Sequence, residues 1–259
     1  MKKLLVIFAL IALVFAAGTI QAKDWKKMRI GVEGAYPPFS YTTADGKLEG
    51  FDIDIAMALC NAMGAECKLV AQDWDGIIPA LMARKYDAIV ASMSITEERK
   101  KKVAFTNKYY QTPAKFVSKK GMVKEFSPET LKGKTVGVQR ATIHDNYITD
   151  NYGKDVKIKR YTTQDEAYMD LAAGRVDFLL ADSVVISEGF LKKPEGQDYE
   201  FVGPDLMDPK WFGEGIGIAC RKKDKDLVEM FNKAIEQIRA DGTYKKIQDK
   251  YFNFDVYGN

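Results

Sequence analysis

The chain has 259 residues, of which 46% are hydrophobic and 29% are charged, a composition typical of a folded, non-repetitive protein. Its 39 lysines and arginines against 36 aspartates and glutamates give a net charge of +3. Nucleic-acid-binding proteins carry a strong basic excess on one face, so this balance argues against that class. Three cysteines and one histidine without paired ligand spacing predict no zinc site. Nothing in the sequence indicates another metal or a cofactor.

The first 22 residues have the pattern of a secretory signal peptide. Lys2 and Lys3 precede an apolar run over 4–17, and a small residue, Ala22, precedes the expected cleavage point. This run is 14 residues long, whereas a membrane span needs about 20, so an uncleaved anchor is the weaker alternative. Removing the two lysines lowers the net charge from +3 to +1. We therefore expect an exported, soluble mature chain that starts at Lys23.

Export makes the cysteines informative. Cys60 and Cys67 enclose a short segment, and an oxidising compartment favours a disulfide between them that holds the end of a helix. Two reduced thiols that happen to lie close together are the alternative. Cys220 lies in an apolar, strand-like run and is expected to be a buried free thiol.

Two patterns recur in the same order in the two halves of the chain. The first is a short β-branched strand followed by a loop, at 29–36 and again at 135–142. The second reads as helix, turn and strand, at 75–91 and again at 165–181. Although two generic α/β units could match by chance, the shared order favours two lobes, each a parallel sheet flanked by helices.

Ligands of open parallel sheets bind beyond the carboxyl ends of the strands. In this chain those positions are 33–36, 92–94, 139–142 and Asp182. Two such sheet edges that face each other predict a cleft between the lobes.

The first group in the predicted cleft suits a carboxylate. Ser94-Ile-Thr-Glu97 has the form of a capping box, with Ser94 as the N-cap of a helix that runs to Val103. Helix N-termini bind anions, and Arg99 within this helix can hold a carboxylate through two parallel hydrogen bonds. The alternative, a solvated basic helix face, explains the lysines at 100–102. Thr142 is a weaker cap for the corresponding helix of the second half.

The other groups suit cations. Asp182 ends an apolar run, where its carboxylate can meet a ligand ammonium or, alternatively, cap the next helix. Glu33, Tyr36 and Trp74 together predict a slot for a flat or extended cation, which two aromatic rings flank and a carboxylate neutralises. Core packing is the alternative for the rings, and it explains the neighbouring phenylalanines better than Trp74.

Several motifs taken together resemble one family, the periplasmic solute-binding proteins of polar amino-acid ABC transporters. The resemblance is closest to lysine/arginine/ornithine- and histidine-binding proteins, and it covers nearly the whole mature chain. Besides the leader, the matching segments are Gly50-Phe-Asp-Ile-Asp-Ile-Ala56, Ser92-Met-Ser-Ile-Thr-Glu-Glu-Arg99, Gly133-Lys-Thr-Val-Gly-Val138, Ala240-Asp-Gly-Thr-Tyr244 and the closing Asp255-Val-Tyr-Gly258.

The resemblance implies the α/β fold of a type II periplasmic binding protein. Each of its two lobes is a parallel-dominated sheet flanked by helices, and two hinge strands join the lobes near 111–114 and 207–212. Lobe 1 would comprise 23–111 and 209–259, so that the C-terminus returns to it, and lobe 2 would comprise 112–208. The lobes would close on an amino acid.

The resemblance also implies roles for individual residues. Arg99 and the Ser94 backbone would hold the α-carboxylate, while Ser92 and Asp182 would hold the α-ammonium. Tyr36 and Trp74 would sandwich the ligand's aliphatic stem, and Glu33 would meet its distal cation. The full implied set is Glu33, Tyr36, Trp74, Ala91, Ser92, Ser94, Arg99, Gln139, Ile143, His144 and Asp182.

At four positions the sequence differs from the pattern of the lysine/arginine/ornithine- and histidine-binding proteins that it resembles. Glu33 stands in place of Asp, Ala91 in place of Ser, Ala141 in place of Gly, and His144 in place of Gln. Losing the hydroxyl at Ala91 opens room beside Glu33 and removes a donor. Plain arginine fits such a slot, and so do carboxyalkyl-arginine compounds (opines).

The function implied is that of a monomeric periplasmic protein that captures a cationic amino acid (arginine, lysine, ornithine or histidine) and delivers it to an ABC permease. An enzyme on the same scaffold is the main alternative, because some similar proteins dehydrate cyclic acids and Glu33 could act as a general acid. The sequence shows no nucleophile, which favours binding over catalysis. A receptor's sensor module is disfavoured by the absence of a later apolar stretch long enough to span a membrane.

Overall fold

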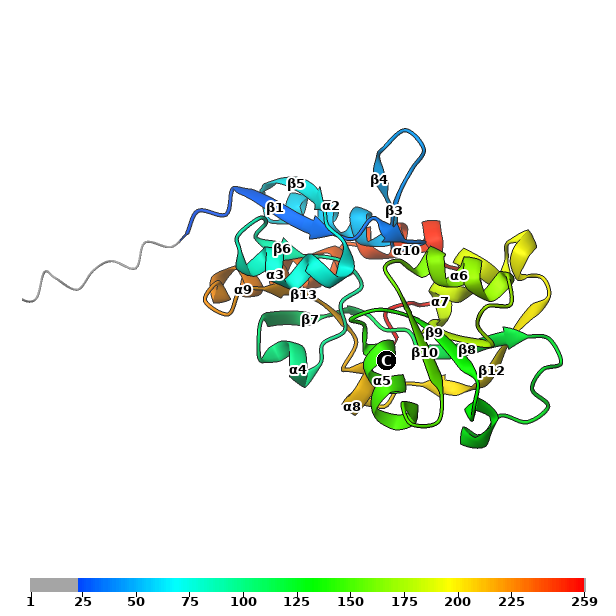
Figure 1. The fold of residues 1–259 in the computed structure, drawn as a ribbon. Coiled ribbons are helices and arrows are strands. Elements are labelled where there is room, and N and C mark those ends of the chain that lie inside the picture. Colours follow the sequence, from blue (N-terminus) through cyan, green and yellow to red (C-terminus); the bar gives the residue numbers. More distant parts are fainter. Residues whose placement is uncertain (1–22, 259) are drawn as a thin grey trace, which may run out of the picture.

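The structure is a computed structural model that describes residues 23–258, so the expected signal peptide, residues 1–22, lies outside the described residues. Two lobes, each built on a five-stranded sheet, lie side by side (Figure 1). None of the helices between residues 23 and 258 is long and apolar enough to cross a membrane. The predicted two-lobe α/β fold is confirmed.

Lobe 1 contains a mixed sheet with the strand order β5-β1-β6-β13-β7. Its strands are β1 (Lys27–Val32), β5 (Glu66–Ala71), β6 (Ala88–Ile89), β7 (Ala104–Tyr110) and β13 (Ile216–Cys220). Strand β1 runs parallel to both β5 and β6, whereas β13 pairs antiparallel with β6 and β7. A smaller three-stranded sheet comprises β2 (Ala35–Tyr36), β3 (Ser40–Thr42) and β4 (Leu48–Glu49).

Helices flank this sheet. They are α2 (Phe51–Ala62), the 3₁₀ turn η1 (Trp74–Gly76), α3 (Ile77–Met82), α4 (Glu97–Lys100), α9 (Lys225–Ala240) and α10 (Thr243–Tyr251). The last two helices pack against α2, and α9 also covers β7, so these two helices belong to the same lobe as β1 (Figure 1).

Lobe 2 repeats the arrangement with the strand order β10-β9-β11-β8-β12. Its strands are β8 (Ala114–Lys119), β9 (Thr135–Gln139), β10 (Lys157–Tyr161), β11 (Phe178–Asp182) and β12 (Tyr199–Leu206). Strand β9 runs parallel to β10 and β11, and β8 pairs antiparallel with β11 and β12. The helical segments are η2 (Pro128–Leu131), α5 (Ile143–Tyr152), α6 (Gln164–Ala172), α7 (Ser183–Ile186), the π-helical η3 (Ser187–Leu191) and η4 (Pro194–Gly196).

The internal repeat predicted from the sequence extends to its hydrogen bonds. In lobe 1 the turn after α3 carries Asp87, whose carboxylate accepts from the Arg29 N–H at 3.1 Å. In lobe 2 the turn after α6 carries Asp177, whose carboxylate accepts from the Thr135 N–H at 2.8 Å. Each aspartate thus ties its turn to the neighbouring parallel strand, β1 or β9, and aligns the carboxyl ends of the strands that form the cleft.

The sequence of strand β11 is continuously apolar because both faces of the strand are buried. Phe178 and Leu180 belong to one hydrophobic cluster, whereas Leu179 and Ala181 belong to another. Because helices cover both faces of a parallel sheet, side chains on both faces are removed from water. The run then ends at Asp182, the first polar side chain of the strand.

Two segments connect the lobes. The first, residues 111–113, links β7 to β8 without a helix or strand of its own. The second lies between β12 and β13 and contains a short helix, α8 (Pro209–Phe212), so the prediction of a simple hinge strand there was incomplete. The Asp208 carboxylate starts this helix by accepting from the Lys210 N–H at 2.9 Å, and a proline at the first helical position favours the same start.

The predictions for the cysteines are confirmed. Cys60 and Cys67 form a disulfide that links the end of α2 to the start of β5. Cys220, at the end of β13, is a buried free thiol.

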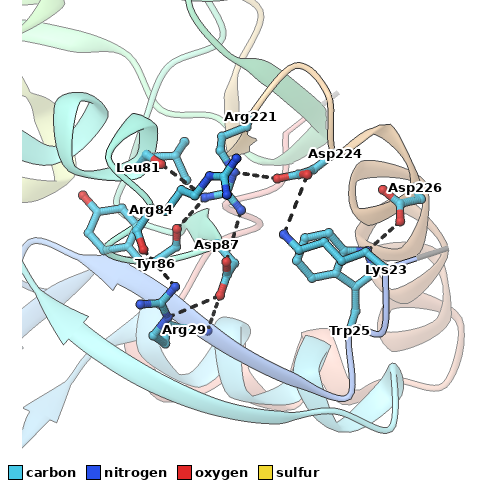
Figure 2. Close-up of polar contacts among 10 residues, drawn as sticks. All are labelled: Lys23, Trp25, Arg29, Leu81, Arg84, Tyr86, Asp87, Arg221, Asp224 and Asp226. Carbon is cyan, nitrogen blue, oxygen red and sulfur yellow. Dashed lines mark hydrogen bonds and ion pairs between the residues drawn. The ribbon is translucent and has the colours of Figure 1, made fainter. Parts of the chain in front are cut away.

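A buried arginine holds the edge of lobe 1 that faces away from the cleft (Figure 2). Arg221, whose side chain is 3% exposed, pairs with Asp224 at 2.6 Å and with Asp87 at 3.1 Å. Its guanidinium also donates to the carbonyls of Tyr86 and Leu81 at 2.7 and 3.2 Å. These contacts join the end of β13 to the turn that precedes β6, and they satisfy a charge that burial would otherwise penalise.

We predict that Arg221→Ala lowers the free energy of unfolding by about 3–5 kcal/mol, because it leaves Asp87 and Asp224 without their buried partner. Arg175→Ala is the matched control, since its pair with Asp170 has an arginine side chain that is 55% exposed. The control should lose less than about 1 kcal/mol. Urea unfolding followed by circular dichroism measures both, and equal losses would contradict the assignment of a stabilising role to burial.

Candidate functional site

The predicted cleft exists, and it lies where the carboxyl ends of the two parallel sheets meet. It comprises an inner cavity, next to Glu33 and Arg99, and an adjoining hinge cavity, next to the connecting segments. The two cavities share Tyr36, Ser92, Ser94, Ile143 and His144. The predicted site residues that line the inner cavity are Glu33, Tyr36, Trp74, Ala91, Ser92, Ser94, Arg99, Gln139, Ile143 and His144, while Asp182 lines the hinge cavity. The structure therefore brings all eleven together.

Arg99 gives one end of the inner cavity a positive charge. Its guanidinium donates to the Ser94 carbonyl at 3.1 Å and lies 5.1 Å from the centre of the Trp74 ring. No carboxylate among residues 23–258 lies within ion-pair distance of it. Burial lowers the pKa of Arg99 to about 10, which still leaves it charged near neutral pH. A half-buried cation without an internal counter-ion is suited to an anionic ligand group.

The helix predicted around Arg99 differs from the observed one. The N-cap is Thr96, whose hydroxyl accepts from the Arg99 N–H at 3.3 Å, and α4 ends at Lys100. The prediction of Ser94 as the cap and Val103 as the end was wrong. Residues 93–95 are extended alongside β13, with an Ile95 N–H donating to the Gly215 carbonyl at 2.8 Å, so the helix can begin only after this pairing ends.

Asp182 caps a helix, which is the alternative that the sequence offered for it, and it also lines the hinge cavity. Its Oδ1 accepts from the N–H groups of Val184 and Val185 at 2.8 and 3.3 Å, which caps α7. The Thr112 hydroxyl donates to Oδ2. Three donors leave one acceptor position of the carboxylate facing the cavity. Burial raises the pKa of Asp182 to about 6, so a ligand cation that approaches it also favours its charged form.

Asp52, which the sequence analysis did not single out, holds the cavity residue Ser92 in place. Its Oδ2 accepts from both the N–H and the hydroxyl of Ser92, at 2.7 and 2.9 Å, and its Oδ1 accepts from the Tyr109 hydroxyl at 2.8 Å. The backbone of Ser92 is left-handed, with φ of 50°, and these two bonds hold it there. Because the only hydroxyl proton of Ser92 points at Asp52, its oxygen is left as an acceptor for a ligand N–H.

A signal for Asp52 was present in the sequence. Asp52 stands between the apolar Phe51 and Ile53 in the first turn of α2, and a buried acid at such a position needs donors. Burial raises the pKa of Asp52 to about 7.

Glu33, just after β1, lines the inner cavity but not the hinge cavity. Its Oε1 accepts from the side-chain amide of Gln139, the last residue of β9, at 2.5 Å. Burial raises the pKa of Glu33 to about 7, and the nearby carboxylates of Asp52, Asp73 and Asp165 add to the effect. No cation among the described residues pairs with Glu33.

Two aromatic residues line the inner cavity together with these charged groups. Tyr36 and Trp74 are each 9% exposed and line the inner cavity. Trp74 also belongs to a hydrophobic cluster with Ile77 and Tyr86, so core packing, which the sequence favoured less for Trp74 than for the phenylalanines, contributes to its position as well. Its indole N–H donates to the Ala141 carbonyl of the other lobe at 3.0 Å, which fixes the plane of the ring.

Lobe 2 supplies the opposite wall. Thr142 caps α5 as predicted, by accepting from the Asp145 N–H at 3.2 Å. His144, in the first turn of this helix, is buried, and burial together with the charge of Arg99 lowers the pKa of His144 to about 3. The imidazole is therefore neutral near neutral pH, and beside it Ile143 adds an apolar surface.

Contacts between the lobes hold the cleft closed in this structure. At its mouth Arg140 pairs with Asp75 at 2.7 Å, and the Asn146 amide donates to Glu98 at 3.2 Å. Together with the Glu33–Gln139 bond described above, they place lobe 2 residues directly over lobe 1.

Within residues 23–258 there is no group of three or more side chains that could hold a metal ion.

The sequence matches the bacterial extracellular solute-binding proteins, family 3, over residues 28–254, and the chain belongs to that family. It is 54% identical to the L-arginine-binding protein of Pseudomonas aeruginosa over 260 residues, covering the whole of both chains. It is 43% identical to the histidine-binding periplasmic protein of Escherichia coli over 259 residues, again along the full length of both.

The fold is also similar to solved structures. A periplasmic binding protein of Salmonella typhimurium described for its high arginine specificity superposes with a TM-score of 0.81 at 33% identity, over 88% of this chain and 100% of that one. Family and fold thus agree with the resemblance that the sequence motifs carry.

Proposed function

We propose that the protein is a monomeric periplasmic binding protein, exported by its leader, that captures a cationic L-amino acid and passes it to an ABC permease. Arginine is the ligand we favour. The observation that carries the proposal is the set of charges in the cleft: Arg99 lacks a carboxylate partner, and Glu33 and Asp182 lack a cationic one. A zwitterion with a distal cation supplies all three missing partners.

In the proposed complex each ligand group meets a complementary side chain. Arg99 donates two hydrogen bonds to the α-carboxylate, assisted by the backbone of Ser94. The oxygen of Ser92 and the open acceptor position of Asp182 take the α-ammonium. Because the Ser92 hydroxyl donates its only proton to Asp52, its oxygen can accept a hydrogen bond from the ammonium but cannot donate one to a carboxylate.

The side chain of the ligand extends toward Glu33. Tyr36 and Trp74 cover an alkyl stem and can stack on a planar guanidinium. Glu33 accepts from the distal cation. Ala91, beside it, lacks a hydroxyl and leaves room, so an opine, an arginine with a carboxyalkyl group, is the alternative ligand.

A dehydratase-type enzyme on this scaffold is the second candidate function. The raised pKa of Glu33, which burial brings to about 7, is what a general acid would need. Asp52 and Asp182, which are also buried in or beside the cleft, show the same shift, so it reflects burial without a counter-ion in all three groups. We therefore propose binding without turnover.

We predict that Glu33→Gln weakens arginine binding at least about thirtyfold, which corresponds to about 2 kcal/mol, because the guanidinium loses its counter-ion in a desolvated cleft. The affinity for glutamine, whose side chain carries no charge, should change less than about threefold. Calorimetric titration of both ligands into ligand-free protein measures this, and chromatography of the recovered ligand tests for turnover.

The exposed Glu229 on α9 provides a matched control, and Glu229→Gln should bind arginine like the wild type. Equal losses of arginine and glutamine affinity in Glu33→Gln would show that Glu33 does not contact the ligand side chain. A wild type that binds no cationic amino acid, or that converts one, would refute the proposed function.

We predict that arginine affinity increases with pH between about pH 5 and pH 7.5. Burial raises the pKa of Glu33 to about 7 and that of Asp182 to about 6, so both carboxyls hold protons in the lower part of this range. A bound cation favours the ionised forms, and each proton that must leave weakens binding up to tenfold per pH unit. Titrations should show that arginine affinity rises at least about tenfold over this pH range in the wild type, and less in Glu33→Gln. A flat profile would contradict the raised pKa values.

A further inference from the structure

Gln139 is held in one orientation by two acceptors. Its amide nitrogen donates to Oε1 of Glu33 at 2.5 Å and to the Thr162 carbonyl at 3.2 Å. Both partners are acceptors, so the NH₂ group must point at them and the amide oxygen must point elsewhere. Neither amide hydrogen is left for a ligand.

The oxygen of this amide is an acceptor without a donor. Gln139 is 2% exposed and lines the inner cavity together with Glu33. No hydrogen bond from any residue between 23 and 258 reaches its Oε1. Because Gln139 lines the cavity, a ligand bound there can donate to this oxygen.

The number of donors on the ligand determines how much this acceptor matters. A guanidinium has five N–H donors in one plane, whereas an ammonium has three on a compact group. Glu33 uses one of its about four acceptor positions for Gln139, so about three remain for donors of the ligand. A guanidinium stacked between Tyr36 and Trp74 then has further in-plane N–H groups that water cannot reach, while an ammonium is nearly satisfied by Glu33 alone.

We propose that Gln139 is a specificity-determining residue that selects a guanidinium over an ammonium, by presenting its amide oxygen as a third acceptor beside Glu33. This inference rests on the proposed binding of a cationic amino acid in the same cleft. Glu33 belongs to lobe 1 and Gln139 to lobe 2, and the Glu33–Gln139 bond exists only where the lobes meet. The acceptor set for a guanidinium is therefore complete only in the closed protein, so the choice of side chain is made at closure.

The test compares arginine with lysine in the wild type and in Gln139→Leu, by calorimetric titration of ligand-free protein. Arginine affinity should fall about tenfold or more, because a hydrogen bond to a charged group is lost in a closed site. Lysine affinity should fall less than about threefold. The change in the ratio of the two affinities is the informative quantity, because loss of packing or of Glu33 positioning would weaken both ligands alike.

Gln237→Leu is the matched control, since Gln237 is exposed on α9, and both affinities should stay as in the wild type. Gln139→Met, which is unbranched and of similar length, replaces Gln139→Leu if the latter does not fold. An unchanged arginine-to-lysine ratio in the folded variant overturns the role of Gln139 and leaves the proposed function standing. A wild type that binds neither ligand overturns both.

Discussion

Charges without counter-ions are the constraint on which the cleft depends. Arg99 and the carboxyls of Glu33 and Asp182 are removed from water, and none of them has an oppositely charged side chain at ion-pair distance. Such groups are costly in a closed site unless a ligand neutralises them or they give up their charge. Burial raises the pKa values of the two carboxyls, which is how they give up their charge in the absence of a ligand. A cationic zwitterion neutralises them instead.

The fold positions these groups through the same hydrogen-bonding interaction in both lobes. In each lobe an aspartate in a turn, Asp87 or Asp177, ties the turn to the start of the neighbouring parallel strand. The carboxyl ends of the strands are aligned as a result, and the polar residues that follow them face the other lobe. Contacts that stabilise lobe 1, such as the buried Arg221 pairs, lie outside the cleft (Figure 2). Stability and ligand recognition therefore use separate sets of charges.

The residues that follow strands were predictable because their placement depends on local pattern. Glu33 and Asp182 each follow or end an apolar run, and the repeat indicated that both runs are strands of parallel sheets. The cap of α4 was not predictable in this way. Whether Ser94 or Thr96 starts the helix depends on β13, which pairs with residues 93–95 from more than 100 residues further along the chain.

The environments of Asp52 and Trp74 could not be predicted either, because they depend on contacts between residues that are distant in sequence. The partners of Asp52 are 40 and 57 residues away, so its effect on Ser92 becomes visible only after folding. Trp74 has polar neighbours in sequence, yet it packs on a hydrophobic cluster and lines the cavity as well. The orientation of Gln139 likewise depends on Glu33 and Thr162, which come from different lobes.

The orientation of a bound ligand tests the central claim most directly. A crystal structure of the protein with L-arginine should place the guanidinium within hydrogen-bond distance of the Glu33 carboxylate and the α-carboxylate on the Arg99 guanidinium. A ligand bound in the reverse direction, or a Glu33 carboxylate that contacts only protein groups, would contradict the account.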